Sequence, residues 1–265
     1  MPGQHLHRSP DERILNIAAY KFVSLTPEFI RSWRPVLRSY CRAYGLKGTV
    51  LLSTEGINLF LAGEDDNLHA LLAYIRSHEP FADLQWKESF SSSIPFTRIL
   101  VKLKKEIIPM GHNINPTEFT APRVTPAELK QWLDTRNDIV MLDTRNTYEY
   151  ERGTFANAMT MDIEHFRTFP AFVEQLDESL KDKTIVTFCT GGIRCEKAGA
   201  YMVEKGFTNV YQLDGGILKY FEDVGEAHYD GNCFVFDGRG SLDPALHAEF
   251  FANSSRGVDG SNEEE

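Results

Sequence analysis

The sequence predicts two mixed α and β domains in tandem: an α+β split βαβ sandwich, then an α/β domain with a parallel sheet. Before residue 108, apolar segments follow the order strand, helix, strand, strand, helix, strand, in which both helices cover one face of an antiparallel sheet. After residue 124, short apolar segments alternate with helical stretches, which is typical of a parallel sheet. We therefore expect domains over residues 13–108 and 125–224, joined by a proline-containing linker over residues 109–124.

The composition is that of a globular protein with an acidic second half. The 265 residues carry 28 Lys and Arg against 38 Asp and Glu, and 42% are apolar, which excludes a disordered, collagen-like or disulfide-scaffold chain. Residues 1–120 have 14 basic and 12 acidic side chains, whereas residues 121–265 have 14 and 26. Any polyanion is therefore expected to meet the first half of the chain.

The remaining segments do not resemble membrane or targeting sequences. Residues 1–12 lack the apolar core of a signal peptide and are expected to be flexible, and no apolar run approaches membrane-spanning length. Residues 225–251 are expected to form a C-terminal extension, and residues 252–265 a disordered acidic tail. The four cysteines suit a reducing compartment, so we expect free thiols in a cytoplasmic protein.

Local signals mark each element of the first domain. Residues 14–23 are rich in β-branched and aromatic side chains and predict a strand, and Pro35 is expected to open a helix that ends before Gly45. Two strands flank residues 54–57 (TEGI), a predicted hairpin. A second helix is predicted after the acidic triplet at residues 64–66, because apolar residues recur there at helical spacing. The other strands are predicted over residues 83–90 and 97–108.

The second domain begins with a clearly signalled helix. Thr125 and Glu128 are expected to form a capping box, with Pro126 at the first helical position. Strands are then predicted over residues 138–143, 184–189 and 209–214. The second of these strands runs into the loop CTGGIR, which is the most informative segment of the chain.

Cys189 lies at the carboxyl end of that strand, at the edge where open α/β sheets bind ligands. The glycines that follow let successive backbone N–H groups turn inward at a helix N-terminus, so an anion cradle is predicted from Thr190, Gly191, Gly192, Ile193 and Arg194. Such donors lower the pKa of a thiol and favour a nucleophilic thiolate, or a persulfide anion. The alternative is a buried cysteine that only packs.

The neighbours of Cys189 leave several roles open. Cys195 is either a packing residue, which we favour, or a slow resolving thiol. Arg194 either forms a salt bridge, for instance with Asp143 or Glu149, or holds an anionic substrate. A cysteine phosphatase needs arginine six positions after its nucleophile, and here that position is Cys195. The shorter loop therefore suits a sulfur-bearing group better than a phosphate.

The loop CTGGIR resembles the active-site loop of rhodanese domains, and MLDTRNTYEYERGTF and VYQLDGGILKY strengthen the match. A wider resemblance, to the rhodanese-containing tRNA uridine hydroxylase family over residues 14–245, rests on AAYKFVSL, GLKGTVLLSTEGIN, KESF, LKKEI, DTRNTYEYERGTF, FCTGGIRCEKA and NCFVFDGR in this order. It implies an acylphosphatase-like (ferredoxin-like) domain before a rhodanese domain. It also implies that Cys189 is the persulfide-forming catalytic residue, supported by Asp143, Arg145 and Cys195.

This resemblance implies conversion of the wobble uridine of tRNA to 5-hydroxyuridine, with molecular oxygen as co-substrate and no other cofactor evident. One alternative is a rhodanese sulfurtransferase that moves persulfide sulfur from a donor such as thiosulfate to an acceptor. Another is a non-catalytic RNA-binding module with a vestigial loop. No histidine spacing indicates a metal site, and no dinucleotide or phosphate-binding loop motif is present. The chain departs from the family at Leu59 and Phe60, which replace the usual Gly-Thr after EGIN, and in having no cysteines after FVFD.

Candidate tRNA contacts lie in the first domain. A positive stripe on or near its last strand is predicted from Lys47, Arg98, Lys102, Lys104 and Lys105. The alternative is a sheet edge that lysines protect from aggregation. Tyr20, Phe60 and Phe90 offer rings that can stack on an unpaired base, although aromatic residues in such strands are more often part of the core.

Overall fold

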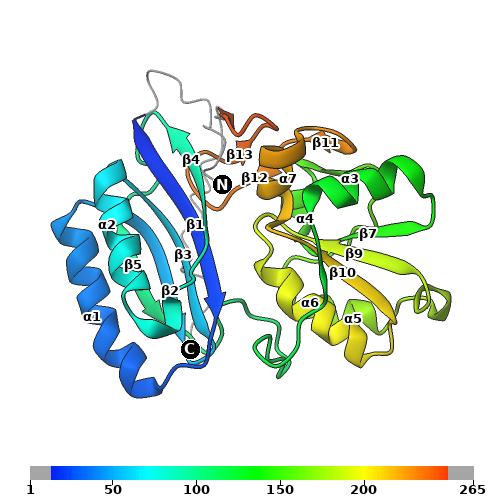
Figure 1. The fold of residues 1–265 in the computed structure, drawn as a ribbon, viewed down its shortest axis with the longest axis horizontal. Coiled ribbons are helices and arrows are strands. Elements are labelled where there is room, and N and C mark those ends of the chain that lie inside the picture. Colours follow the sequence, from blue (N-terminus) through cyan, green and yellow to red (C-terminus); the bar gives the residue numbers. More distant parts are fainter. Residues whose placement is uncertain (1–12, 250–265) are drawn as a thin grey trace.

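The computed structural model describes residues 13–249, so the predicted flexible N-terminus and acidic tail, residues 1–12 and 252–265, lie outside the described residues. Two domains face each other across a cavity that both of them line (Figure 1). The first domain, blue to cyan, presents the helix-free face of its sheet to the second domain. Over residues 13–249, no helix has the length and apolar character needed to cross a bilayer.

The first domain is a five-stranded sheet with two helices on one face (Figure 1). Its elements are β1 (Ile14–Phe22), α1 (Pro27–Ala43), β2 (Lys47–Ser53), β3 (Gly56–Gly63), α2 (Asp65–Arg76), the 3-10 turn η1 (Glu79–Phe81), β4 (Trp86–Ser91) and β5 (Ile99–Leu103). The strand order is β4-β1-β3-β2-β5. Trp33 and Leu37 of α1 pack with Leu68 and Leu72 of α2 in one core. The predicted sandwich is therefore confirmed.

Two expectations about this domain were wrong. Helix α1 begins at Pro27, because the Thr26 side chain accepts a hydrogen bond from the Phe29 N–H (3.1 Å) and proline is well suited to a first helical position. Pro35 therefore lies inside the helix instead of opening it. The sheet is also not wholly antiparallel, since β5 pairs parallel to β2. Strand periodicity indicates which face a side chain takes but not which edge of the sheet the strand joins.

The second domain is a parallel four-stranded sheet, in the order β6-β10-β9-β7, between two helical layers. Its elements are β6 (Arg123–Val124), α3 (Pro126–Thr135), β7 (Ile139–Asp143), α4 (Thr147–Tyr150), β8 (Gly153–Phe155), η2 (Phe166–Thr168), α5 (Phe169–Val173), η3 (Glu178–Leu180), β9 (Thr184–Phe188), α6 (Ile193–Glu204), β10 (Asn209–Leu213) and α7 (Gly216–Val224). Helices α5 and α6 lie on one side of the sheet, and α3 and α7 on the other (Figure 1). The predicted α/β fold is confirmed, as is the capping box of Thr125 and Glu128.

The residues after α7 contact both domains. The short strands there are β11 (Tyr229–Gly231), which pairs with β8, and β12 (Cys233–Phe234), β13 (Ser241–Leu242) and β14 (Ala248–Glu249), which form a small sheet. Beyond β12, the Gly238 N–H donates to the Pro95 carbonyl (2.9 Å), and Arg239 Nη1 donates to Ser89 Oγ (2.7 Å). This segment therefore fastens β4 of the first domain to the second.

Candidate active site

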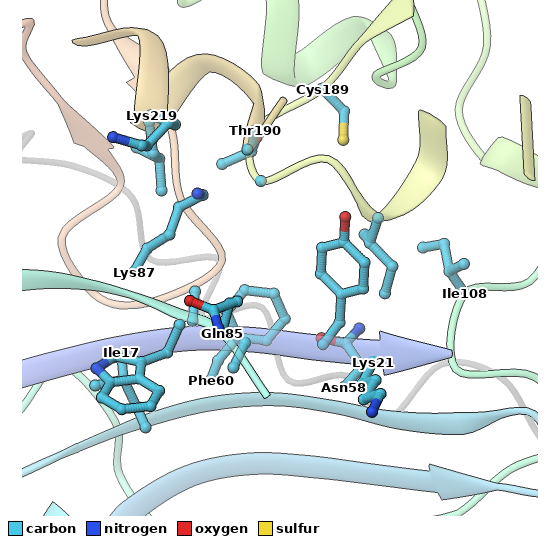
Figure 2. Close-up of a pocket in the computed structure, with 18 of the residues that line it drawn as sticks. Ile17, Lys21, Asn58, Phe60, Gln85, Lys87, Ile108, Cys189, Thr190 and Lys219 are labelled. Carbon is cyan, nitrogen blue, oxygen red and sulfur yellow. The ribbon is translucent and has the colours of Figure 1, made fainter. Parts of the chain in front are cut away.

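Cys189 lies directly after β9, where the loop to α6 lines a cavity of about 790 Å³ between the two domains. Figure 2 shows its sulfur pointing into the curve of the loop, on the side where the sheet of the first domain lies. The residue is only 2% exposed, so its sulfur is shielded from bulk water. The sequence-predicted nucleophile therefore lies in the wall of an interdomain cavity.

The cysteine loop keeps its amides inward because its carbonyl groups are engaged elsewhere. The N–H groups of Ile217 and Leu218, in the first turn of α7, donate to the carbonyls of Cys189 (3.0 Å) and Thr190 (3.1 Å). Gly216 permits this approach, since its φ is +67° and a Cβ atom there would lie 2.4 Å from the Cys189 carbonyl oxygen. Gly216, the second glycine in VYQLDGGILKY, is therefore required for the close packing of α7 on the loop.

The surroundings of Cys189 stabilise a negative sulfur. Gly192, with a φ of +98° at the N-cap of α6, donates its N–H to Cys189 Sγ (3.1 Å). Burial raises the pKa of Cys189, but the hydrogen bond from Cys195, the charge of Arg194 and the amides of Arg194 and Gly192 outweigh burial and bring the pKa down to about 6. A thiolate therefore predominates at neutral pH, held by the amides of Gly192 and Arg194, two of the five residues of the predicted anion cradle.

Arg194 is engaged by the domain itself. Its guanidinium forms a salt bridge with Glu149 (2.8 Å), and both side chains are buried. Asp143, the other partner considered, pairs with Arg145 (2.6 Å) at a position without exposed surface. Arg145 also donates to the Gly153 carbonyl (2.7 Å). Asp143 and Arg145 therefore brace the loop after β7, and neither lines the cavity.

Cys195 has no exposed surface and does not line the cavity. Its thiol is hydrogen-bonded with Cys189 and lies 3.9 Å from Thr144 Oγ1. Burial, together with the hydrogen bond and charge of Cys189, raises the pKa of Cys195 well above its usual value. Cys195 therefore stays a protonated donor to the Cys189 thiolate, in addition to packing in the first turn of α6.

The wall opposite the cysteine loop comes from alternate residues of three neighbouring strands. The sheet register pairs Ala18 of β1 with Phe60 of β3 and with Lys87 of β4, and pairs Tyr20 of β1 with Asn58 of β3. Paired residues and residues two apart on a strand share one face of a sheet. All five accordingly line the cavity, and Figure 2 shows Phe60, Lys87 and Asn58 on this wall.

The aromatic candidates for base stacking separate into two groups. Tyr20 and Phe60 line the cavity, whereas Phe90 packs against the core of the first domain. The family departure at Leu59 and Phe60 is accommodated within β3, because Leu59 is buried in the core and Phe60 faces the cavity. The Phe60 ring centroid lies 6.3 Å from that of Phe236, so the departure adds an aromatic wall to the cavity.

A buried lysine joins the two domains, and the sequence reasoning did not single it out. Lys197, whose side chain is 1% exposed, forms salt bridges with Glu55 (2.8 Å) and Glu106 (2.7 Å). Its amine also donates to the Ile108 carbonyl (3.1 Å). One sequence feature could have indicated this cluster: Lys197, Glu55 and Glu106 each lie inside a segment that carries the family resemblance, namely CEKA, STEGIN and LKKEI.

Glu196, next to this lysine, is a second interdomain contact that sequence reasoning missed. It accepts hydrogen bonds from the Tyr20 hydroxyl (3.0 Å), from Arg123 (2.6 Å) and from Gln212 (3.2 Å). Burial and the charge of Glu196 raise the pKa of Tyr20 well above its usual value, with a smaller contribution from Cys189. Tyr20 therefore remains a protonated hydroxyl on the cavity wall.

The predicted positive stripe lies away from the cavity. Its members follow β5 and the adjacent start of β2: Lys47, Arg98, Lys102, Lys104 and Lys105. Strand β5 is at the opposite edge of the sheet from β4, and the cavity lining includes none of these five residues. The lysines that do line the cavity are Lys21, Lys87 and Lys219, which the sequence reasoning did not select.

The reactive groups that the described residues bring to the cavity are a thiolate, a hydroxyl and amines. All four cysteines are free and buried. Across residues 13–249, no three His, Cys, Asp or Glu side chains are grouped so as to hold a metal ion.

Two family models divide the chain as the domains do. Residues 14–107 match the UPF0176 acylphosphatase-like domain, and residues 125–223 match the rhodanese-like domain. The curated tRNA uridine(34) hydroxylases of Cupriavidus taiwanensis and Paraburkholderia xenovorans are each 53% identical to this chain, over 88% of its length and 84% of theirs. The chain belongs to the tRNA uridine(34) hydroxylase family. The family resemblance drawn from the sequence is thereby confirmed.

Other comparisons add a further family member and a single-domain structure. The tRNA uridine(34) hydroxylase of Burkholderia thailandensis is 52% identical over 88% of this chain and 81% of its own. The solution structure of a rhodanese-like domain from Anabaena sp. is 23% identical, covers 42% of this chain and 80% of its own, and has a TM-score of 0.35.

The segments that carry the family resemblance are far apart in the sequence and meet at the cavity. AAYKFVSL contributes Tyr20, KESF contributes Lys87, FCTGGIRCEKA contributes Cys189, and NCFVFDGR contributes Arg239. Four segments from both domains thus each place a residue on one interdomain cavity.

Proposed function

We propose that this chain hydroxylates the wobble uridine of tRNA to 5-hydroxyuridine in the cytoplasm, with molecular oxygen as co-substrate. The observation that carries the proposal is its 53% identity, over most of both chains, to proteins named tRNA uridine(34) hydroxylase. The cavity supports it, because about 790 Å³ lies in the range of small-molecule sites and has room for one nucleotide.

In this proposal, Cys189 is the catalytic residue, as a thiolate or a persulfide. The backbone amides of Gly192 and Arg194 and the charge of Arg194 stabilise its negative sulfur. On the facing wall, Phe60 offers a stacking surface for a base. The Tyr20 hydroxyl donates to Glu196, so its oxygen is an acceptor suited to the N3–H of a uracil ring.

The test is mass spectrometry of tRNA from cells that lack the protein and are rescued with wild type, Cys189→Ala or Cys233→Ala. Cys233 of β12 is buried against the core of the second domain but does not line the cavity, so it is a matched control. Wild type and Cys233→Ala are expected to restore 5-hydroxyuridine, and Cys189→Ala is not. Unchanged 5-hydroxyuridine with Cys189→Ala would remove the cysteine from the mechanism.

A second activity is favoured by the amide cradle around the Cys189 sulfur. In a sulfurtransferase, the thiolate attacks the sulfane sulfur of thiosulfate, a persulfide S–S bond forms, and sulfite leaves with the electron pair of the broken S–S bond. The terminal sulfur then passes to an acceptor, which becomes thiocyanate when the acceptor is cyanide. Fast turnover with thiosulfate and cyanide, without any change in tRNA, would favour this activity over hydroxylation.

A non-catalytic RNA-binding module remains the third hypothesis, and it predicts an inert Cys189. Rapid alkylation of Cys189 near neutral pH would count strongly against it, because only a stabilised thiolate reacts fast under those conditions.

A further inference from the structure

Lys87 differs from every other cation that lines the cavity. Five of these cations form a salt bridge with a carboxylate: Lys21, Arg123, Arg194, Lys219 and Arg239. Among residues 13–249, no carboxylate oxygen lies within 4.0 Å of the Lys87 amine. Asp214 and Glu222 act on Lys87 through space, but each also pairs with another cation, Arg123 (3.7 Å) and Lys219 (3.6 Å) respectively.

Lys87 reaches from β4 across to the second domain. A Cβ atom on Gly215, the N-cap of α7, would lie 2.4 Å from Lys87 Nζ, so the amine is seated against this glycine. Figure 2 shows the amine pointing into the space that Thr190 and Lys219 border on the other side. Burial lowers the pKa of Lys87, because the charged amine has lost part of its water without gaining a carboxylate at contact distance.

The sheet register sets the distance between Lys87 and the residues that meet the cysteine loop. Ala18 lies between Phe60 and Lys87, and its small side chain leaves a hollow between them. Tyr20 reaches Gly192, since a Cβ atom there would lie 3.0 Å from the Tyr20 hydroxyl. From the usual strand and residue spacings, Lys87 and Tyr20 stand about 8 Å apart in the sheet, which is the scale of one nucleotide.

We propose that Lys87 binds the backbone phosphate next to the uridine whose base enters the cavity. The inference rests on the proposed function and deepens it: the ligand is one nucleotide turned out of the anticodon loop, with its base between Phe60 and the Cys189 loop and its phosphate at the Lys87 amine. Lys87 neutralises a phosphate without first breaking a salt bridge, unlike the five paired cations. Unpaired loop bases are also more easily turned out than bases in a duplex.

The experiment measures binding of an unmodified anticodon stem-loop RNA to the full chain at several salt concentrations. Wild type is compared with Lys87→Gln, Lys87→Arg and Lys130→Gln. Lys130 pairs with Asp134 on α3 and does not line the cavity, so its variant loses the same charge elsewhere. One lost phosphate contact on a single strand lowers the slope of log K against log salt by about 0.7.

We expect the slope of log K against log salt to fall in Lys87→Gln alone, and this variant should bind the RNA roughly tenfold more weakly at low salt. Lys87→Arg and Lys130→Gln should keep the wild-type slope. An unchanged slope in Lys87→Gln, at an unchanged urea midpoint, would overturn the proposal. A lower slope in Lys102→Gln but not in Lys87→Gln would place the contact on the outer edge strand and overturn it too. A raised KM for thiosulfate in Lys87→Gln with unaltered RNA binding would instead assign the amine to a sulfur donor.

Binding is read without turnover, which separates this inference from the proposed function. A wild-type chain that binds RNA but forms no 5-hydroxyuridine would count against hydroxylation. The salt dependence of RNA binding by Lys87→Gln, compared with wild type, would still decide whether the phosphate contact exists.

Discussion

Two buried cations on α6, three residues apart, serve different parts of the molecule. Arg194 pairs with Glu149 inside the second domain, and both side chains are almost fully buried. Lys197 pairs with Glu55 and Glu106 across the domain interface, and these carboxylates keep 20% and 25% of their exposure. The first pair acts on the sulfur, because the charge of Arg194 lowers the pKa of Cys189. The second cluster ties the first domain, which forms the cavity wall opposite the sulfur, to α6.

This difference separates the reactivity of the cysteine from the enclosure of the cavity. The amides and the arginine that hold Cys189 negative belong to the second domain alone. The wall of the cavity opposite Cys189 belongs to the first domain, with Ala18, Tyr20, Asn58, Phe60 and Lys87. Variants of the two clusters are therefore expected to change different measurements.

The largest effect is expected for Glu149→Ala, which leaves the Arg194 guanidinium buried without a partner. Removing one member of a buried pair costs about 3–5 kcal/mol of unfolding free energy. Urea denaturation measures it, with Lys181→Ala as a control that breaks an exposed pair with Glu178 and leaves the midpoint unchanged. A Glu149→Ala protein as stable as wild type would show that the pair does not support the loop.

A smaller loss of stability is expected for Lys197→Met, about 1–3 kcal/mol, because the carboxylates left behind can regain water. The pH profile of Cys189 alkylation should keep its wild-type midpoint, while 5-hydroxyuridine formation falls because the facing wall is no longer held. If the alkylation midpoint moves in Lys197→Met, the two clusters do not have separate roles.

The smallest effect is expected for Cys195→Ala, which removes one donor to the Cys189 thiolate. The pKa of Cys189 should rise, so alkylation at pH 6 to 7 slows because less thiolate is present, whereas the rate above pH 9 stays the same. Cys233→Ala is the control. Cys233 is also buried, but it is not among the groups that shift the pKa of Cys189. Equal alkylation profiles for both variants would remove Cys195 from the electrostatics of the site.

The sequence predicts the features that depend on local patterns. The position of Cys189 follows from an apolar strand that ends in a glycine loop, and the split sandwich follows from the order of the apolar segments. Pro35 misled the prediction because Thr26 and Pro27 give a stronger start signal eight residues earlier. The local sequence pattern also left two salt-bridge partners for Arg194, Asp143 and Glu149, because it does not show which carboxylate lies closer in the fold.

The contacts that need both domains were beyond local pattern. Lys197 and Glu196 look like ordinary surface charges of a helix until the first domain is docked on them. Lys87 alternates with core residues on β4, as a solvent-facing lysine does, and only the docked second domain turns that face into a cavity wall. The stripe from Lys47 to Lys105 is predicted because Lys102 and Lys104 share one face of a strand, but that strand lies at the outer edge of the sheet.

The most direct measurement is the pH dependence of iodoacetamide labelling at Cys189 in the full chain, read by peptide mass spectrometry. A midpoint near pH 6 is expected, with labelling that falls steeply below it as the thiolate takes up a proton. A midpoint near 8.5, as for an unperturbed thiol, or no labelling at any pH, would contradict a stabilised sulfur anion facing the cavity.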